Sequence, residues 1–292
     1  MIPRRDTLAV EQVVPNNAAS KSLNVGNGWA WGTWTEISAG LSFPFILTHI
    51  AVSTLWSGTG TGSVLANDIQ IQVGTGSAGN ESSIGECGDS FYASVANGAS
   101  FNLATNKMYS LAPVLIPANT RLAGRVTQLQ SSTLTIDTLL LGYDATKYSI
   151  ARYMQTMRDI DNFLKGLKTK TSKVVPSAGN TLVSAGIPAW TWGSWVDFLS
   201  PASKDCLIQG VISYKQGIGK AVHQGIGVGA SAGGETMMSV TCTPGALSAC
   251  SCGISFLPRP LFIKKGEYVG IRQKSNLGGF SAYLNLFYQE LT

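Results

Sequence analysis

Two clusters of tryptophan are the residues in this sequence whose type and spacing could bind a ligand. Each cluster places three tryptophans within six residues, with the same spacing in both: Trp29, Trp31 and Trp34, and then Trp190, Trp192 and Trp195. An exposed indole can stack on a sugar ring, whereas a buried indole anchors a core or a subunit contact. Because neighbouring side chains of a strand point to opposite faces, at most two tryptophans of a cluster can share a face. We expect one side of each cluster to pack into a domain core, with stacking on a glycan as the alternative.

One carboxylate recurs in the same manner. Glu81 and Glu235 each follow a glycine-rich turn, and the residues that precede them match. A glycosidase needs two carboxyl groups across one cleft, and no second carboxylate recurs close to either glutamate along the chain. We therefore expect a structural role, in which each carboxylate accepts hydrogen bonds from the backbone amides of its loop.

Histidine and cysteine are too few and too scattered for a repeated catalytic or metal site. The two histidines, His49 and His223, do not occupy matching places in the chain, so they form neither a triad nor a repeated metal site. The five cysteines are odd in number, and the close pair Cys250 and Cys252 lacks the usual two-residue spacer of a zinc site. The sequence predicts no catalytic residue, no metal site and no cofactor, and it indicates that the chain is not an enzyme.

The tryptophan clusters and the glutamates belong to an internal duplication. Six segments recur in the same order: 13–15 as 174–176, 29–34 as 190–195, 71–74 as 226–229, 77–81 as 231–235, 113–125 as 260–272, and 139–143 as 284–288. The offset falls from 161 for the first two pairs to 147 for the fifth, and residues are lost only between the matched apolar segments. Since loops tolerate deletions better than strands do, this pattern indicates two copies of one β-rich unit.

Alternation of apolar and polar residues within each copy predicts half-buried strands. Ile69, Ile71 and Val73 point to one face, and Gln70 and Gln72 point to the other. Roughly six to eight such segments per copy, with turns about 8–12 residues apart, favour a Greek-key sandwich or jelly roll. The predicted fold class is all-β, with two tandem jelly-roll-like β-sandwich domains joined by one amphipathic α-helix. The expected divisions are an N-terminal arm (1–12), repeat 1 (13–143), a helical linker (144–173) and repeat 2 (174–292).

The linker has a different periodicity from the two repeats. Its apolar residues recur three or four positions apart between Ile150 and Leu167, which predicts an amphipathic helix over about 146–168. The linker is also the most basic part of the chain. We expect its apolar face to cover a flank of the two repeats, with binding of a partner protein as the alternative.

Composition limits the partners of the chain. Of the 292 residues 13% are charged and the net charge is +5, so much of the surface must be uncharged and polar. Neither repeat carries the basic stripe that specific nucleic-acid binding requires. No stretch of about 18 apolar residues occurs and the N-terminus has no secretory signal, so we expect no membrane association.

Three motifs resemble a known group of proteins. These are the tryptophan segment 29–34, the strand 71–76 with Glu81 after it, and above all the segment 113–123. They resemble small β-sandwich virion proteins of tailed bacteriophages, such as head-decoration or cement proteins, head fibres and tail accessory modules. The resemblance covers both repeats but not the linker, and the second copy departs from it at Lys264 and Tyr268.

The resemblance implies a structural component of a phage virion, assembled in the host cytoplasm. The function that it favours is a capsid decoration or cement protein that bridges and stabilises coat subunits through its N-terminal arm and domain surfaces. The implied partners are phage coat or other virion proteins and further copies of the chain, with a trimer favoured. Two alternatives remain: a receptor-binding or carbohydrate-binding head-fibre or tail module with a glycan receptor, and a double-jelly-roll coat protein.

Overall fold

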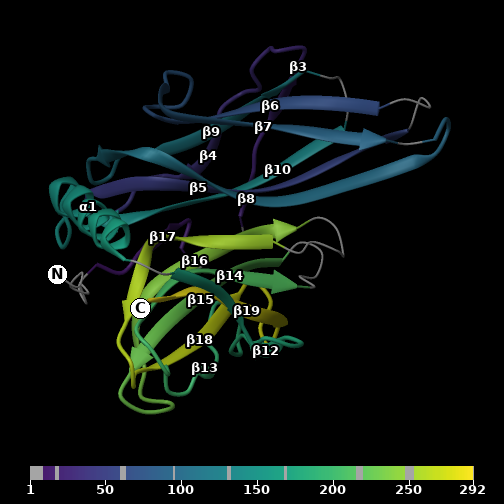
Figure 1. The fold of residues 1–292 in the computed structure, drawn as a ribbon. Coiled ribbons are helices and arrows are strands. Elements are labelled where there is room, and N and C mark those ends of the chain that lie inside the picture. The colour runs from purple at the N-terminus through teal and green to yellow at the C-terminus, as the bar shows by residue number, and fades with distance from the viewer. Residues whose placement is uncertain are drawn as a thin grey trace.

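The computed structural model shows two β-sandwiches and one helix (Figure 1). It describes residues 9–16, 20–59, 64–94, 96–129, 133–167, 170–214, 220–246 and 253–291. Repeat 1 lies in the upper half of Figure 1 and repeat 2 in the lower half. The two halves are therefore separate sandwiches that lie against each other.

Repeat 1 is built from two sheets. Its strands are β1 (Gln12–Val14), β2 (Lys21–Ser22), β3 (Val25–Asn27), β4 (Thr35–Ser38), β5 (Phe45–Thr59), β6 (Val64–Thr75), β7 (Ser82–Ser94), β8 (Ser100–Ile116), β9 (Leu122–Gln128) and β10 (Thr133–Asp144). One sheet has the order β1-β10-β5-β8, with β2 also on β10. The other has the order β3-β9-β6-β7, with β4 also on β9.

Repeat 2 has the same arrangement, except that an isolated bridge between Ala185 and Gln273 takes the place of β3. Its strands are β11 (Lys170–Val175), β12 (Thr181–Ser184), β13 (Val196–Leu199), β14 (Cys206–Tyr214), β15 (Lys220–Gly229), β16 (Thr236–Ala246), β17 (Gly253–Ile263), β18 (Tyr268–Ser275) and β19 (Ser281–Leu291). One sheet has the order β11-β19-β14-β17, with β12 also on β19, and the other has the order β13-β18-β15-β16.

Both strand orders define a jelly roll. The first strand of each repeat is split, into β1 and β2 or into β11 and β12, and the second strand is β4 or β13. With the strands numbered in this way within each repeat, one sheet has the order 1-8-3-6 and the other 2-7-4-5. The predicted fold class, all-β with tandem jelly-roll-like sandwiches, is confirmed.

The cores form where the alternating pattern predicts them. Ile69, Ile71 and Val73 of β6 are at most 2% exposed and lie in the core of repeat 1, whereas Gln70 faces solvent. Repeat 2 has an equivalent core between its own sheets, which includes Ile226, Ile271 and Leu286.

The structure corrects one segment of the predicted duplication. The alignment of 71–74 with 226–229 pairs Gly74 with Gly229. In the structure Gly74 lies beside Ala123 of β9, and the residue at the matching place beside Gly270 of β18 is Gly227. A shift of two residues leaves every side chain on the same face of its strand, so the sequence pattern does not detect it.

The two sandwiches share a buried interface. The outer face of the β1-β10-β5-β8 sheet presents Val13, Ala51 and Leu141, and these pack against Val240 and Cys242 of β16. One sheet of repeat 1 is therefore covered on both faces, by its own core and by repeat 2.

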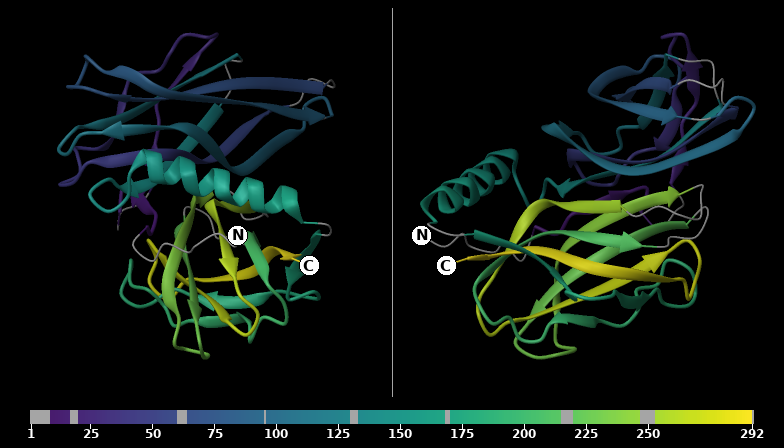
Figure 2. Two further views of the ribbon diagram at one scale, coloured as in Figure 1. Left: turned by 60° about the vertical axis from the view of Figure 1, so that its left-hand side comes forward. Right: turned by 45° about the vertical axis from the view of Figure 1, so that its right-hand side comes forward.

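Helix α1 (Ile150–Gly166) lies across both repeats (Figure 2). It begins later than predicted because the Ser149 side chain caps it, accepting a hydrogen bond from the Arg152 backbone N–H at 3.2 Å. Its first half packs through Tyr153 on repeat 1, and its second half packs through Ile160 on repeat 2. The expectation that its apolar face covers a flank of the two repeats is confirmed.

The end of the N-terminal arm lies between the repeats. Residues 1–8 fall outside the described residues, but Ala9 and Glu11 are 1% and 3% exposed. Ala9 and Glu11 are therefore used inside the chain, and most of the arm that we expected to make outward contacts lies outside the described residues. The described part of the chain contains no helix that is long and apolar enough to cross a bilayer.

Candidate functional site

In repeat 1 the tryptophan cluster holds an arginine. The Arg125 guanidinium carbon lies 4.9 Å from the ring centre of Trp31 and 4.3 Å from that of Trp34. Arg125 stands on β9 between Gly124 and Val126, whose side of the strand faces the core. The cluster therefore lies on the outer face of the β3-β9-β6-β7 sheet, where it forms a cation–π clamp.

Repeat 2 builds the same clamp. The Arg272 guanidinium carbon lies 5.1 Å from the ring centre of Trp192 and 4.4 Å from that of Trp195. The support differs, because the Arg125 Nε–H donates to Gln72 Oε1 at 2.9 Å, while the Arg272 Nε–H is buried and has no hydrogen-bond partner in the described part of the chain. Burial accordingly lowers the pKa of Arg272.

Loops, not strands, position the tryptophans. Residues 29–34 connect β3 to β4, and the backbone N–H of Gly32 donates to the Val126 carbonyl oxygen at 2.9 Å. A Cβ at Gly32 would lie 2.2 Å from the Asn24 carbonyl oxygen, so only glycine fits this close approach. The tryptophans therefore lie on loops outside the sheets, where strand alternation does not apply. Trp192 packs against the buried cluster between the repeats, which includes Val240 and Cys242.

The first tryptophan of each cluster has an unusual backbone. Trp29 and Trp190 adopt φ values of 65° and 63°, in the left-handed region that few non-glycine residues enter. The Trp190 ring lies 5.1 Å from the His223 ring, whereas Trp29 is 44% exposed. Trp29 is thus the tryptophan of the two clusters that is most available to a ligand.

Glu81 belongs to an ion network in repeat 1. Its carboxylate accepts a hydrogen bond from Arg121, whose Nε–H also donates to Glu36 Oε2 at 2.8 Å. The Glu81 side chain is 1% exposed. Burial alone would raise the pKa of Glu81, but the hydrogen bond and the charge of Arg121 hold it below its usual value.

Glu235 has a different environment in repeat 2. It is 8% exposed, and its carboxyl is hydrogen-bonded by the backbone of Gly233 and Glu235 in its own turn and by the Asp197 carboxyl. Burial and the neighbouring Asp197 carboxyl raise its pKa. Tyr268 aligns with Arg121 of repeat 1 at the offset of 147.

The sequence missed the second carboxylate of each repeat. Glu36 and Asp197 recur at the offset of the tryptophan clusters, and each lies on the strand that follows its cluster. They are far from Glu81 and Glu235 along the chain, so inspection of the neighbouring sequence did not find them. The arginines of the clamps, Arg125 and Arg272, are the last residues of a recurring segment, and this recurrence was the available signal.

Both histidines, Cys206 and Cys242 are buried, and Cys87 is half-buried. Burial lowers the pKa of His49 to about 4 and, with the charge of Lys274, that of His223 to about 3. Cys87, Cys206 and Cys242 are free thiols, and burial raises the pKa of each. Cys250 and Cys252 lie outside the described residues.

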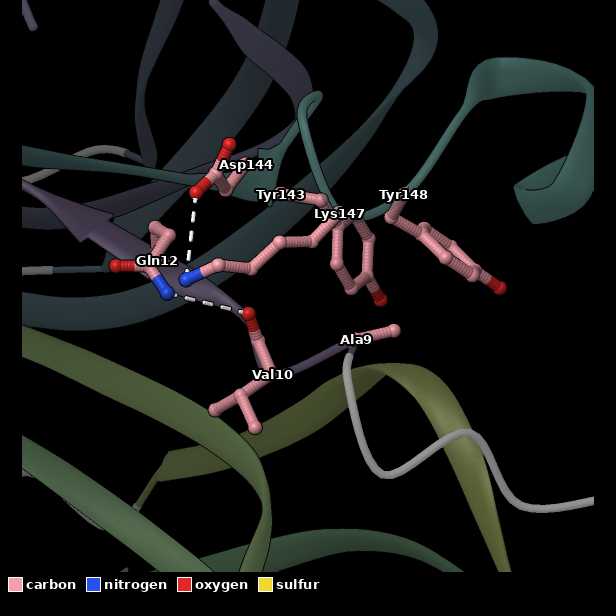
Figure 3. A pocket seen from close by; sticks show the side chains of 7 residues that line it. All are labelled: Ala9, Val10, Gln12, Tyr143, Asp144, Lys147 and Tyr148. Carbon is pink, nitrogen blue, oxygen red and sulfur yellow. Dashed lines mark hydrogen bonds and ion pairs between the residues drawn. The ribbon is translucent and has the colours of Figure 1, made fainter. Parts of the chain in front are cut away.

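A pocket of about 250 Å³ lies where the arm meets the residues that precede α1 (Figure 3). Its lining residues are Ala9, Val10, Gln12, Tyr143, Asp144, Lys147 and Tyr148. Lys147 Nζ lies 3.5 Å from Asp144 Oδ2, and this ion pair forms part of the wall. None of the tryptophans or glutamates singled out above lines this pocket, so the duplicated clusters and the pocket are separate features.

Comparisons with known proteins found only distant structural similarity. No protein-family model matches the chain, and no curated protein matches it. A chain of the T13 infectious bursal disease virus particle aligns with a TM-score of 0.27 and 11% identity, over 87% of this chain and 56% of that one. The VP2 subviral particle of the same virus aligns with a TM-score of 0.28 and 13% identity, over 100% of this chain and 74% of that one.

A bacterial protein also aligns. The CBM22-1-CBM22-2 tandem domain of Paenibacillus barcinonensis Xyn10C has a TM-score of 0.21 and 11% identity, with 99% of this chain and 93% of that one covered. Scores in this range do not define a common fold. The assignment as a jelly roll rests on the strand order of this chain.

Proposed function

We propose that this chain is a structural protein of a phage virion, which decorates the capsid and stabilises it by bridging coat subunits. The observation that carries the proposal is that two jelly rolls of one topology are fixed to each other by a buried interface. A symmetric shell offers the same binding site many times over. Two similar domains in a fixed orientation can bind two such sites at once, without the loss of conformational entropy that ordering a flexible linker would bring.

The contacts between the repeats support this rigidity. Glu11 accepts hydrogen bonds from Tyr143 Oη of repeat 1 and from the Val240 backbone N–H of repeat 2, each at 2.9 Å. Arg259 of repeat 2 donates to the Ala9 carbonyl oxygen at 3.1 Å. Together with α1, these bonds join both sandwiches to the same short segment of chain.

We further propose that the chain is not an enzyme. The groups that could perform chemistry take part in structural contacts: Arg125 is clamped by tryptophans, and Glu81 is paired with Arg121. His223, with its pKa of about 3, is neutral near pH 7. The partners in this proposal are phage coat or other virion proteins and two further copies of the chain, with no role for specific nucleic acid, a membrane or a cofactor.

Co-sedimentation of the purified chain with virus particles from the same source tests the proposal. We expect saturable binding to heads, a number of copies set by the lattice, and a higher temperature of capsid disruption when the sites are filled. Light scattering of the free protein should give three times the mass of one chain. Failure to bind particles, or binding to tails alone, would overturn the decoration role.

Two observations favour other functions. The exposed ring of Trp29 favours a carbohydrate-binding or receptor-binding module, for which a glycan array should show saturable binding that Trp29→Ala removes. The tandem jelly rolls also suit a double-jelly-roll coat protein, for which the purified chain should assemble into shells without a partner.

A further inference from the structure

One sheet of each repeat has an outer face that holds the same place in the fold. In repeat 1 this face belongs to the β1-β10-β5-β8 sheet, and repeat 2 covers it through Val240 and Cys242. In repeat 2 the matching face belongs to the β11-β19-β14-β17 sheet. A jelly roll of the same chain therefore covers this face in repeat 1, and no third jelly roll follows to cover it in repeat 2.

The strand register identifies the residues that match between the two faces. Val13 lies opposite Leu141, and Val174, which is the recurrence of Val13, lies opposite Phe287. Phe287 is thus the counterpart of Leu141, one residue later than the recurring sequence segments suggest. Leu141 is buried between the repeats, so the face on which Phe287 lies is the counterpart of a covered surface.

The face of repeat 2 is apolar and open. Phe256 of β17 meets the Phe287 ring edge-on, with 6.4 Å between the ring centres, and it is 51% exposed. Four residues before Phe287, Tyr283 lies opposite Leu182 of β12, and these two side chains are 41% and 49% exposed. Ile212 of β14 lies on the same face between the two pairs. These five side chains form what we call the open face of repeat 2.

The two central strands of the open face carry no charge. The outward positions among residues 283–287 of β19 and 210–214 of β14 hold tyrosine, asparagine, phenylalanine, glycine and isoleucine. In repeat 1 the place of Tyr283 is held by a carboxylate, Asp137. The open face is therefore more apolar at this place than the face that is covered in repeat 1. Exposed apolar patches of this kind mark contacts between proteins.

The open face is continuous with contacts that exist within the chain. At one end of the same sheet, Leu207 and Phe262 are covered by Ile160 of α1. Along the edge of the sheet, β17 lies against β8 of repeat 1. A protein that packs on the open face therefore extends two established interfaces.

The surface that covers the matching face of repeat 1 cannot be used again. Val240 is already buried within its own chain. Its counterpart in repeat 1 is Glu86, which lies opposite Gln72 as Val240 lies opposite Gly225. Glu86 is exposed, and burial of its charge against aromatic rings would cost free energy. Another copy of the chain therefore matches the open face best with its own open face.

We infer that the open face of repeat 2 packs against the same face of other copies of this chain. The inference rests on the trimer of the proposed function, in which the three open faces meet around the threefold axis. Burial of apolar and aromatic surface stabilises such a contact. The central strands bring no charge into it, so no ion has to lose its water.

Light scattering of the full-length chain over a range of concentrations tests the inference. We expect the wild type to have three times the mass of one chain. Phe256→Lys and Tyr283→Lys should each have the mass of one chain, because every copy would bring a lysine into an apolar contact. Tyr92→Lys is the control, since Tyr92 of β7 is 67% exposed and lies in repeat 1, and its mass should equal that of the wild type. Thermal unfolding shows whether each variant is folded.

Co-sedimentation of the same proteins with heads separates this inference from the decoration role. A wild-type mass of one chain at every concentration would overturn the inference, and binding of that single chain to heads would leave the decoration role intact. A trimer that the two lysine variants dissociate, without any binding to heads, would support the open face while the decoration role fails.

Two results with the variants would also overturn the inference. Trimers of folded Phe256→Lys and Tyr283→Lys that still bind heads would place the contact between copies on another surface. Trimers of these variants that no longer bind heads would assign the open face to a coat subunit.

Discussion

Removal of the Glu11 carboxylate should loosen the two repeats from each other. Glu11 is 3% exposed and accepts one hydrogen bond from each repeat, from Tyr143 and from the Val240 backbone N–H. Burial raises the pKa of Glu11, and the charge of Arg259, which is 4% exposed, opposes this shift. In Glu11→Ala both donors lose their acceptor and Arg259 stays buried without its counter-charge.

The size of the effect follows from these contacts. The change leaves two buried donors without an acceptor and the buried Arg259 charge without a nearby carboxylate, so the free energy of unfolding should fall by about 3–5 kcal/mol. For a chain of this size the melting temperature should fall by roughly 6–20 °C. Glu11→Gln keeps the size of the side chain and one acceptor oxygen, and it should cost about 1–3 kcal/mol.

Urea unfolding followed by tryptophan fluorescence measures these changes. The control is Asp161→Asn on α1, whose side chain is 57% exposed and pairs with Lys165, and it should change stability by less than about 0.5 kcal/mol. A loss of unfolding free energy in Glu11→Ala that is no larger than in this control would contradict the prediction, because the arm would then not be seated between the repeats.

Three further predictions concern the buried histidine and the clamps. Because burial lowers the pKa of His223 to about 3, the unfolded chain binds a proton at this histidine first, and folding stability is lost as pH falls from about 6.5. In urea titrations, the free energy of unfolding of His223→Gln should fall by about 3 kcal/mol less than that of the wild type between pH 7 and pH 4. Equal losses in the two proteins would contradict this prediction. Arg125→Lys removes the stacking on the tryptophan rings and the hydrogen bond to Gln72, so the free energy of unfolding should fall by about 1–2 kcal/mol. Arg272→Lys should cost less, because the Arg272 Nε–H has no hydrogen-bond partner among the described residues. Equal costs of the two variants in thermal unfolding would contradict this prediction. Gly227→Ala places a Cβ 2.6 Å from Trp195 Cη2, so the free energy of unfolding should fall by about 1–3 kcal/mol and the tryptophan fluorescence maximum should shift. An unchanged spectrum and stability would show that the ring does not cover this glycine.

The sequence predicts the strands and the helix because these depend on local periodicity. Ile69, Ile71 and Val73 alternate with polar residues and are buried as expected. The helix is recognisable because its apolar residues follow a period of 3.6, which no sheet strand uses. The duplication also predicts that the two repeats share one fold, because the same sequence pattern occurs in both.

The strand order was beyond the sequence because it depends on pairs far apart in the chain. β1 pairs with β10, for example, so that Val13 lies opposite Leu141. Period-two patterns say which face a residue occupies but not which strand lies beside it. The strand order of the jelly roll therefore became known only from the structure.

The candidate site was predicted in part. Its tryptophans and Glu81 and Glu235 were identified by recurrence, but their partners Arg125, Arg272 and Asp197 were not. The clamps form because residues 29–34 leave the sheet and fold over its outer face, and strand rules do not apply to such a loop. An arginine of one strand then meets aromatic rings that a strand reading would have placed in the core.

Electron microscopy of virus particles from the same source, labelled for this chain, tests the proposed function most directly. We expect label at regular positions on the head lattice, with both jelly rolls of each copy in one fixed relative orientation in a reconstruction. Label confined to the tail tip would support a receptor-binding module in its place. Absence of the chain from the particles would contradict a role in the virion.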